Sequence, residues 1–181
     1  PALGARVNVE GTINILEIAK EANIKRTVYA SSVAALGMPP KGPWKETLYG
    51  AYKLANEHTA FVYWADWQVP SIGIRPNIVY GLARDQGMSS KNTVAIQAAV
   101  LDKSYKIPYT GKYSWLYAGE AALAFITSVS NDMVGSNVFN LNGSCETIEN
   151  GLKLIKELKP NSSVTCEGQP LPFPPNLDDL P

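Results

Sequence analysis

Tyr49 and Lys53 are the most informative pair in the chain, because they stand four residues apart in the run Tyr-Gly-Ala-Tyr-Lys. At positions i and i+4 of a helix, two side chains lie on the same face, one turn apart. A lysine ammonium beside a tyrosine hydroxyl favours the phenolate, so the tyrosine can exchange a proton with a substrate near neutral pH. The pair therefore predicts acid–base chemistry.

Two serines precede this pair, at the end of the run Arg-Thr-Val-Tyr-Ala-Ser31-Ser32. A serine hydroxyl at a strand end can hydrogen-bond the same substrate oxygen that the tyrosine protonates or deprotonates. Ser32, Tyr49 and Lys53 together suggest redox chemistry at a carbinol or carbonyl carbon.

The surrounding pattern predicts the elements that position these residues. Helices alternate with short apolar strands, which is typical of a parallel sheet with helices on its faces. Right-handed connections place Ser32 and the loop at Pro76 on the same carboxyl edge of that sheet, where ligands collect. The expected elements here are helices over 5–23 and 49–67 and strands over 27–30 and 71–74.

The rest of the chain is less regular. Residues 33–48 contain Pro39, Pro40 and Pro43 and predict a loop. Further along, we expect helices over 93–101, 119–129 and 148–158 and extended segments over 107–110, 137–141 and 163–166.

Composition excludes several classes of function. The chain has 181 residues, enough for one domain or one and a half, and its 16 basic residues balance 16 acidic ones. No basic stripe supports nucleic acid or an anionic membrane as a partner. No apolar run approaches the roughly 20 residues that span a bilayer.

Cysteine and histidine usage predicts no metal site. Cys145 and Cys166 are the only cysteines and His58 the only histidine, and their spacing matches no metal motif. Two reduced thiols in a cytoplasmic protein are favoured over a disulfide. We expect His58 at the surface or an interface rather than in catalysis.

Four motifs carry a family resemblance across residues 5–81. They are Asn8-Val-Glu-Gly-Thr, Val-Tyr-Ala-Ser31-Ser32 with Gly37 five residues on, Tyr49-Gly-Ala-Tyr-Lys53, and Arg75-Pro-Asn-Ile-Val-Tyr-Gly. In this order the chain resembles the extended short-chain dehydrogenase/reductases, the NAD-dependent epimerase/dehydratase family. Over 82–181 the resemblance is looser.

The resemblance implies an α/β fold with a partial Rossmann-type, doubly wound parallel sheet and a smaller mixed α/β substrate-binding region. Residues 1–81 would be the C-terminal part of the dinucleotide-binding domain. Residues 82–181 would be mainly substrate-binding, with 118–143 returning to the Rossmann sheet.

The resemblance also assigns roles to the catalytic residues. Tyr49 would be the general acid–base, and Lys53 would assist it and hold the nicotinamide ribose. Ser32 would orient the substrate hydroxyl or carbonyl.

Further contacts follow from the same resemblance. Asn8, Ser31, Pro76 and Ile78 would lie against the cofactor, as would Tyr49 and Lys53. Asn77 and Arg84 are candidate substrate contacts, with a loop ion pair to Asp85 as the alternative for Arg84.

Two departures from the family pattern narrow the expectations. None of the 14 glycines has the Gly-x-x-Gly-x-x-Gly spacing that holds a cofactor pyrophosphate, so the chain resembles a fragment without that part. The choice between NAD and NADP then stays open, with NAD favoured. Family dehydratases carry Thr-Asp-Glu where this chain has Ser32-Val33-Ala34, which disfavours water elimination.

The expected function is an NAD(P)-dependent epimerase or dehydrogenase that acts on a sugar, sugar acid or nucleotide sugar. Family members commonly pair through the helices at 5–23 and 49–67, and the second carries excess aromatics, so a homodimer is expected. Two alternatives stay open: an NADPH-dependent ketone reductase, and a non-catalytic member that binds a dinucleotide or a protein.

Overall fold

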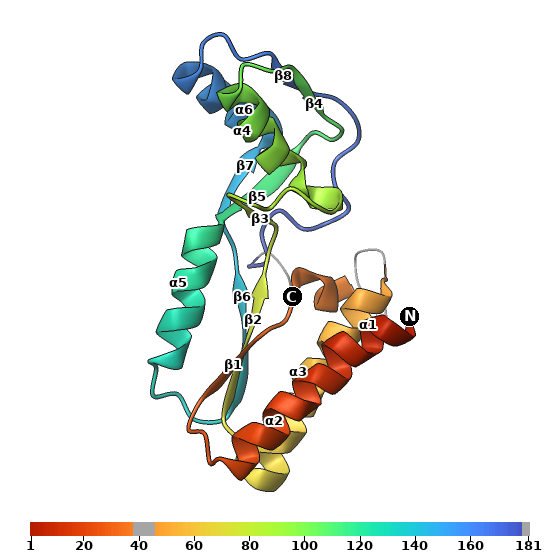
Figure 1. The fold of residues 1–181 in the computed structure, drawn as a ribbon, viewed down its shortest axis with the longest axis vertical. Helices are drawn as coiled ribbons and strands as arrows, with labels where there is room; N and C mark the ends of the chain where they lie inside the picture. Colours follow the sequence, from red (N-terminus) through yellow and green to blue (C-terminus); the bar gives the residue numbers. More distant parts are fainter. Residues whose placement is uncertain (38–45, 179–181) are drawn as a thin grey trace. The chain divides into compact units, whose positions relative to one another are not determined.

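The computed structural model describes residues 1–37 and 46–178 (Figure 1). It divides into two compact units. Unit 1 comprises Pro1–Pro76 and Ala122–Leu141, and unit 2 comprises Asn77–Ala121 and Asn142–Pro181. The predicted α/β class, with a parallel sheet and helices, is confirmed.

Unit 1 contains a three-stranded parallel sheet in the order β1-β2-β6. Its strands are β1 (Thr27–Ala30), β2 (Ser71–Pro76) and β6 (Ser136–Leu141). Ala30 pairs with Ile74, and Ile74 pairs with Phe139. Because all three strands are parallel, their carboxyl ends share one edge, and the segment that carries Ser31 and Ser32 leaves the sheet there.

Helices pack beside this sheet. The expected helix over 5–23 is observed as three consecutive segments, and the helix expected over 49–67 begins one residue earlier. The segments are α1 (Ala2–Ala5), the π-helical turn η1 (Arg6–Glu10), α2 (Gly11–Glu21) and the long α3 (Leu48–Trp67). Figure 1 shows α2 and α3 side by side, and their shared core consists of Leu16, Ala19, Ala60, Tyr63 and Val69.

Unit 2 contains two small sheets and two helices. The first sheet joins β3 (Val79–Tyr80), β5 (Lys112–Tyr117) and β7 (Ser144–Thr147), and the second joins β4 (Tyr105–Ile107) and β8 (Val164–Cys166). The helices are α4 (Lys91–Val100) and α6 (Ile148–Leu158), with a short 3₁₀ turn η3 (Met88–Ser90) before α4. The core contains Ile78, Ala95, Ile107, Tyr109, Tyr113 and Ile148.

Two further helical segments complete the described elements. The 3₁₀ turn η2 (Val33–Gly37) follows β1, and α5 (Ala118–Val129) begins in unit 2 and continues into unit 1. The rest of the loop predicted over 33–48, with its three prolines, lies outside the described residues between 38 and 45.

The structure corrects the expected strands of unit 2. The extended segment placed at 107–110 is instead β4, which ends at Ile107, because Pro108 has no N–H to donate to a ladder. β5 was not predicted. The adjacent residues Tyr113 and Ser114 are both buried in this strand. Its sequence therefore lacks the strict alternation of apolar and polar residues that marks a strand with one solvent-exposed face.

Three further findings concern partners and metals. Among the described residues, no helix has the length and apolar character to cross a membrane. Within residues 1–37 and 46–178, no group of three or more His, Cys, Asp or Glu side chains could hold a metal ion. Cys145 and Cys166 are free thiols.

Candidate active site

Tyr49 and Lys53 lie in the first turns of α3. Thr47 caps this helix, because its hydroxyl accepts a hydrogen bond of 2.9 Å from the Gly50 amide. One turn separates the two side chains, and Lys53 Nζ lies 5.5 Å from the centroid of the Tyr49 ring. Tyr49 is 47% exposed.

Lys53 reaches from α3 to the end of β1. Its Nζ donates a hydrogen bond of 2.8 Å to the carbonyl oxygen of Ala30. Burial lowers the pKa of Lys53 below that of an ordinary lysine. The Lys53 side chain is thus partly buried, lies beside Tyr49 and is hydrogen-bonded to the strand that leads to Ser32.

Ser32 occupies the turn between β1 and η2. Its hydroxyl accepts a hydrogen bond of 3.2 Å from the Ala34 amide, and η2 packs against α3. Ser32 and the two α3 residues thus come from segments that the fold holds in contact.

Gly50 makes this contact close, and the sequence did not single it out. A Cβ atom at this position would lie 2.4 Å from the Ala34 carbonyl oxygen, far inside the normal contact distance. Only glycine lets η2 approach the turn of α3 that carries Tyr49. A glycine directly after Tyr49, inside a helix where it costs about 1 kcal/mol, was the available signal.

Asn8 lies in the π-helical turn η1, which also packs against α3. Its amide donates to the Gly4 carbonyl at 3.1 Å, and the Thr12 hydroxyl donates to the Asn8 carbonyl at 2.7 Å. Single π turns inside helices are frequent at functional sites. The predicted contact of Asn8 with a cofactor stays a prediction.

Ser31 is buried, and its hydroxyl donates to Glu57 on α3. The Glu57 carboxylate also accepts two hydrogen bonds from Arg75, at 2.7 Å and 2.6 Å. The Ser31 side chain is thus hydrogen-bonded inside unit 1, and its predicted cofactor contact stays a prediction.

The predicted residues around Pro76 divide between the units. Pro76 ends β2 in unit 1, whereas Asn77 and Ile78 begin unit 2 and are buried there. The Asn77 amide donates to the Pro174 carbonyl at 3.0 Å, and its Oδ1 accepts from the Ile78 amide at 2.9 Å. Their contacts with cofactor and substrate stay predictions.

Arg84 lies in the loop before η3. Its guanidinium donates to the Gln86 carbonyl and, at 3.4 Å, to the Ser89 hydroxyl. The alternative ion pair with Asp85 is not among the ion pairs of the described residues.

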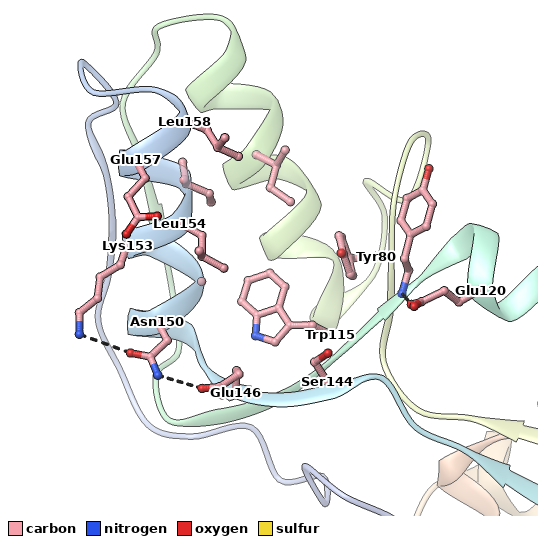
Figure 2. Close-up of a pocket in the computed structure, with 14 residues that line it drawn as sticks. Tyr80, Trp115, Glu120, Ser144, Glu146, Asn150, Lys153, Leu154, Glu157 and Leu158 are labelled. Atoms are coloured by element: carbon pink, nitrogen blue, oxygen red, sulfur yellow. Dashed lines mark hydrogen bonds between the residues drawn. The ribbon is translucent and has the colours of Figure 1, made fainter.

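Unit 2 also contains a concave pocket of about 850 Å³ (Figure 2). Its aromatic residues are Tyr80, Trp115 and Tyr117. The rings of Tyr80 and Trp115 pack edge to face, with 5.6 Å between their centroids. Figure 2 shows the helix α6 along one side, with its Leu154 side chain turned toward Trp115. Sequence reasoning missed this pocket because its aromatics come from β3 and β5, whose pairing sets Tyr80 beside Tyr117.

The sequence matches the NAD dependent epimerase/dehydratase family over residues 1–141. This range contains Ser32, Tyr49 and Lys53 and is more than half of the chain. The chain belongs to this family. Membership in an NAD-dependent family supports the predicted cofactor class, NAD or NADP.

Individual relatives agree with this assignment. UDP-glucose 4-epimerase of Mycolicibacterium smegmatis is 26% identical over 191 residues, which cover 99% of this chain and 59% of the relative. The structure of L-threonine dehydrogenase from Phytophthora infestans superimposes with a TM-score of 0.83 at 20% identity and covers 99% of this chain and 64% of that one. UDP-N-acetylglucosamine 4-epimerase from Methanobrevibacter ruminantium M1, in complex with UDP-N-acetylmuramic acid, gives a TM-score of 0.76 at 22% identity, covering 93% and 58%.

These similarities confirm the Rossmann-like fold, and at such low identity the structures show the fold alone. The chain spans about three fifths of the length of these relatives.

Lys53 has hydrogen-bond donors that would fit the ribose of such a cofactor. An ammonium group has three donors, and among the described residues Lys53 Nζ uses one of them, on the Ala30 carbonyl. The remaining donors suit the hydroxyls of a ribose. No glycine-rich turn of the pyrophosphate-binding kind occurs in the sequence.

Proposed function

We propose that the protein to which this chain belongs is an NAD(P)-dependent epimerase or dehydrogenase with Ser32, Tyr49 and Lys53 as its catalytic residues. The observation that carries the proposal is Lys53, which contacts both the Tyr49 ring and the end of the strand that leads to Ser32. When bound, the nicotinamide cofactor supplies a hydride acceptor or donor.

Each of the three residues has a distinct task in this proposal. The Tyr49 hydroxyl takes the proton from a substrate alcohol, or returns it to a carbonyl. The Lys53 ammonium lies beside the ring of that tyrosine and binds the ribose. Ser32 donates a hydrogen bond to the substrate oxygen and fixes its orientation.

Dehydration does not belong to the proposed reactions. Val33 and Ala34 follow Ser32 where the family's dehydratases have an acid and a base, and Val33 is buried. Epimerisation and alcohol oxidation need no further ionisable group at these positions.

For the substrate, we favour a sugar, sugar acid or nucleotide sugar, in line with the two UDP-sugar epimerases described above. A small hydroxy amino acid is the second candidate. The threonine dehydrogenase fold covers nearly the whole chain, and Arg84 is the only arginine of unit 2. Arginine commonly binds phosphate through bidentate hydrogen bonds, and a nucleotide sugar has two phosphates, so a single arginine favours this second candidate.

We also propose that the protein is a homodimer that pairs through α1, α2 and α3. Large apolar side chains are exposed on these helices, an arrangement that marks association surfaces. They include Leu3, Val7, Ile15 and Ile18 on the first helical stretch and Phe61 and Trp67 on α3. The cytoplasmic location expected from the cysteine usage stays a prediction.

The substitution Tyr49→Phe tests the catalytic proposal in the full-length protein. We expect kcat to fall about 10²- to 10⁴-fold, because the variant lacks its proton-transfer group. Turnover is measured with NAD⁺ on UDP-glucose and on L-threonine. Tyr52→Phe is the matched control, since the Tyr52 hydroxyl donates instead to the Pro1 carbonyl. Full turnover in Tyr49→Phe, or none in the wild type, would overturn the proposal.

A further inference from the structure

A buried carboxylate lies one helical turn beyond Lys53. Glu57 is four residues further along α3 and is only 6% exposed. Arg75 Nε donates to one of its oxygens at 2.7 Å and Arg75 Nη2 to the other at 2.6 Å, a bidentate geometry. A carboxylate this deeply buried is expensive to desolvate, and the partly buried Arg75 compensates its charge.

The Glu57 carboxylate also accepts a hydrogen bond from Ser31. The parallel register explains why the three side chains meet. Ala30 pairs with Ile74, and the Ser31 amide continues the ladder by donating to the Ile74 carbonyl at 2.7 Å. Ser31 and Arg75 each follow one member of this pair. Since side chains alternate along both strands, the two lie on the same face of the sheet, where they meet Glu57 of α3.

The peptide between Ala30 and Ser31 is therefore fixed at several points. Its carbonyl accepts from Lys53 at 2.8 Å, its N–H donates to Ile74 and the adjoining Ser31 hydroxyl donates to Glu57. Ser32 follows this peptide directly. A displacement of Ser31 would thus move both the acceptor that holds Lys53 and the position of Ser32.

We propose that Glu57 and Arg75 are positioning residues, which act through Ser31 to hold the peptide that orients Lys53 and Ser32. The assignment of Lys53 and Ser32 to catalysis rests on the proposed function. The simpler alternative is that the ion pair only fastens α3 to the sheet, in which case its loss would lower stability alone.

Ser31→Ala separates these two readings, because it removes the link to the peptide and leaves the Glu57–Arg75 pair intact. Ser71→Ala is the matched control. Ser71 is a buried serine of the same sheet, and its hydroxyl donates to Ser136 at 3.0 Å. Glu57→Gln and the double variant Ser31→Ala/Glu57→Gln complete a cycle in the full-length protein.

In this set, we expect Ser31→Ala to lower kcat about 10- to 100-fold with little change in KM, which corresponds to an interaction made chiefly in the transition state. The double variant should have a kcat no lower than that of Glu57→Gln alone, since both substitutions break the same connection between Glu57 and Ser31. Ser71→Ala should lose stability but keep kcat. Turnover is followed with NAD⁺ and UDP-glucose or L-threonine.

Hydrogen exchange of the segment 30–33 provides a readout that does not need activity. It should accelerate in Ser31→Ala and stay unchanged in Ser71→Ala. Unchanged kcat in Ser31→Ala, in a protein that Tyr49→Phe inactivates, would overturn the positioning role and leave the proposed function standing. If the wild type shows no turnover, the proposed function fails, and unchanged exchange at 30–33 would then overturn the network as well.

Discussion

Lys53 contacts the two groups that define the candidate site, the ring of Tyr49 and the carbonyl of Ala30. Burial lowers its pKa, so the folded protein binds this proton more weakly than the unfolded chain does. The contribution of Lys53 to the free energy of unfolding is therefore lowest at a pH below its pKa in both the folded and the unfolded state. It rises as the pH increases toward the pKa of a free lysine. At neutral pH, the charged Lys53 amine therefore lowers the stability of the folded protein.

The substitution Lys53→Met tests this conflict between stability and function. At neutral pH we expect the variant to unfold at a higher denaturant concentration than the wild type, because the cost of the buried charge is gone. Ala30 is an exposed residue, so water can replace Lys53 at its carbonyl in the variant. The difference should shrink as the pH rises toward the pKa of a free lysine, because the buried amine of the folded protein loses its proton before that pH is reached. A gap that is constant with pH would contradict the prediction, and catalysis should be lost throughout.

At the scale of elements, the site depends on how closely η2 packs against α3. Gly50 sets this approach, since any side chain there would collide with the Ala34 carbonyl. The cap at Thr47 fixes where α3 begins, and thereby the turn on which Tyr49 lies. A short turn, a helix start and one glycine thus determine the separation of Ser32 from Tyr49.

Gly50→Ala is predicted to separate these two elements. We expect a loss of about 1–3 kcal/mol in the free energy of unfolding, the usual cost of overpacking, together with a lower kcat. Gly11→Ala is the matched control, because its Cβ would lie 3.6 Å from the nearest atom, the Arg6 carbonyl oxygen. That variant should keep or gain stability, by up to about 1 kcal/mol. Equal urea midpoints for the two variants would refute the packing argument.

At the scale of the whole molecule, α2 and α3 each expose large apolar side chains. Ile18 on α2 is 58% exposed and Phe61 on α3 is 60% exposed. Contiguous apolar residues on neighbouring helices are characteristic of association surfaces. These observations support the proposed homodimer.

The double variant Ile18→Glu/Phe61→Glu tests the homodimer. Charged groups in an apolar interface lack partners, so we expect the full-length variant to sediment as a monomer while the wild type sediments as a dimer. Leu154→Glu, at a residue of α6 that is 61% exposed, controls for the added charge. A wild type that is already monomeric at micromolar concentration would rule the dimer out.

The sequence predicted most of unit 1 and less of unit 2. The helices around 5–23 and 49–67 and the strand at 27–30 have clear periodicity, and the structure has them within a few residues. In unit 2, β5 pairs with strands on both sides, and its buried polar residue Ser114 hides the alternation. The periodicity of apolar residues identifies a helix or strand only when one of its faces is exposed to solvent and therefore polar.

The sequence by itself determined the residue types and spacings: a tyrosine and a lysine one turn apart, two serines at a strand end, and no acid after Ser32. These are local properties, set by the geometry of one helix or one strand. Only the tertiary structure showed that Lys53 is held by Ala30, that Gly50 admits η2, and that Glu57 joins Arg75 to Ser31. Those contacts join residues far apart in the chain, so they depend on strand register and helix packing, which no local pattern specifies.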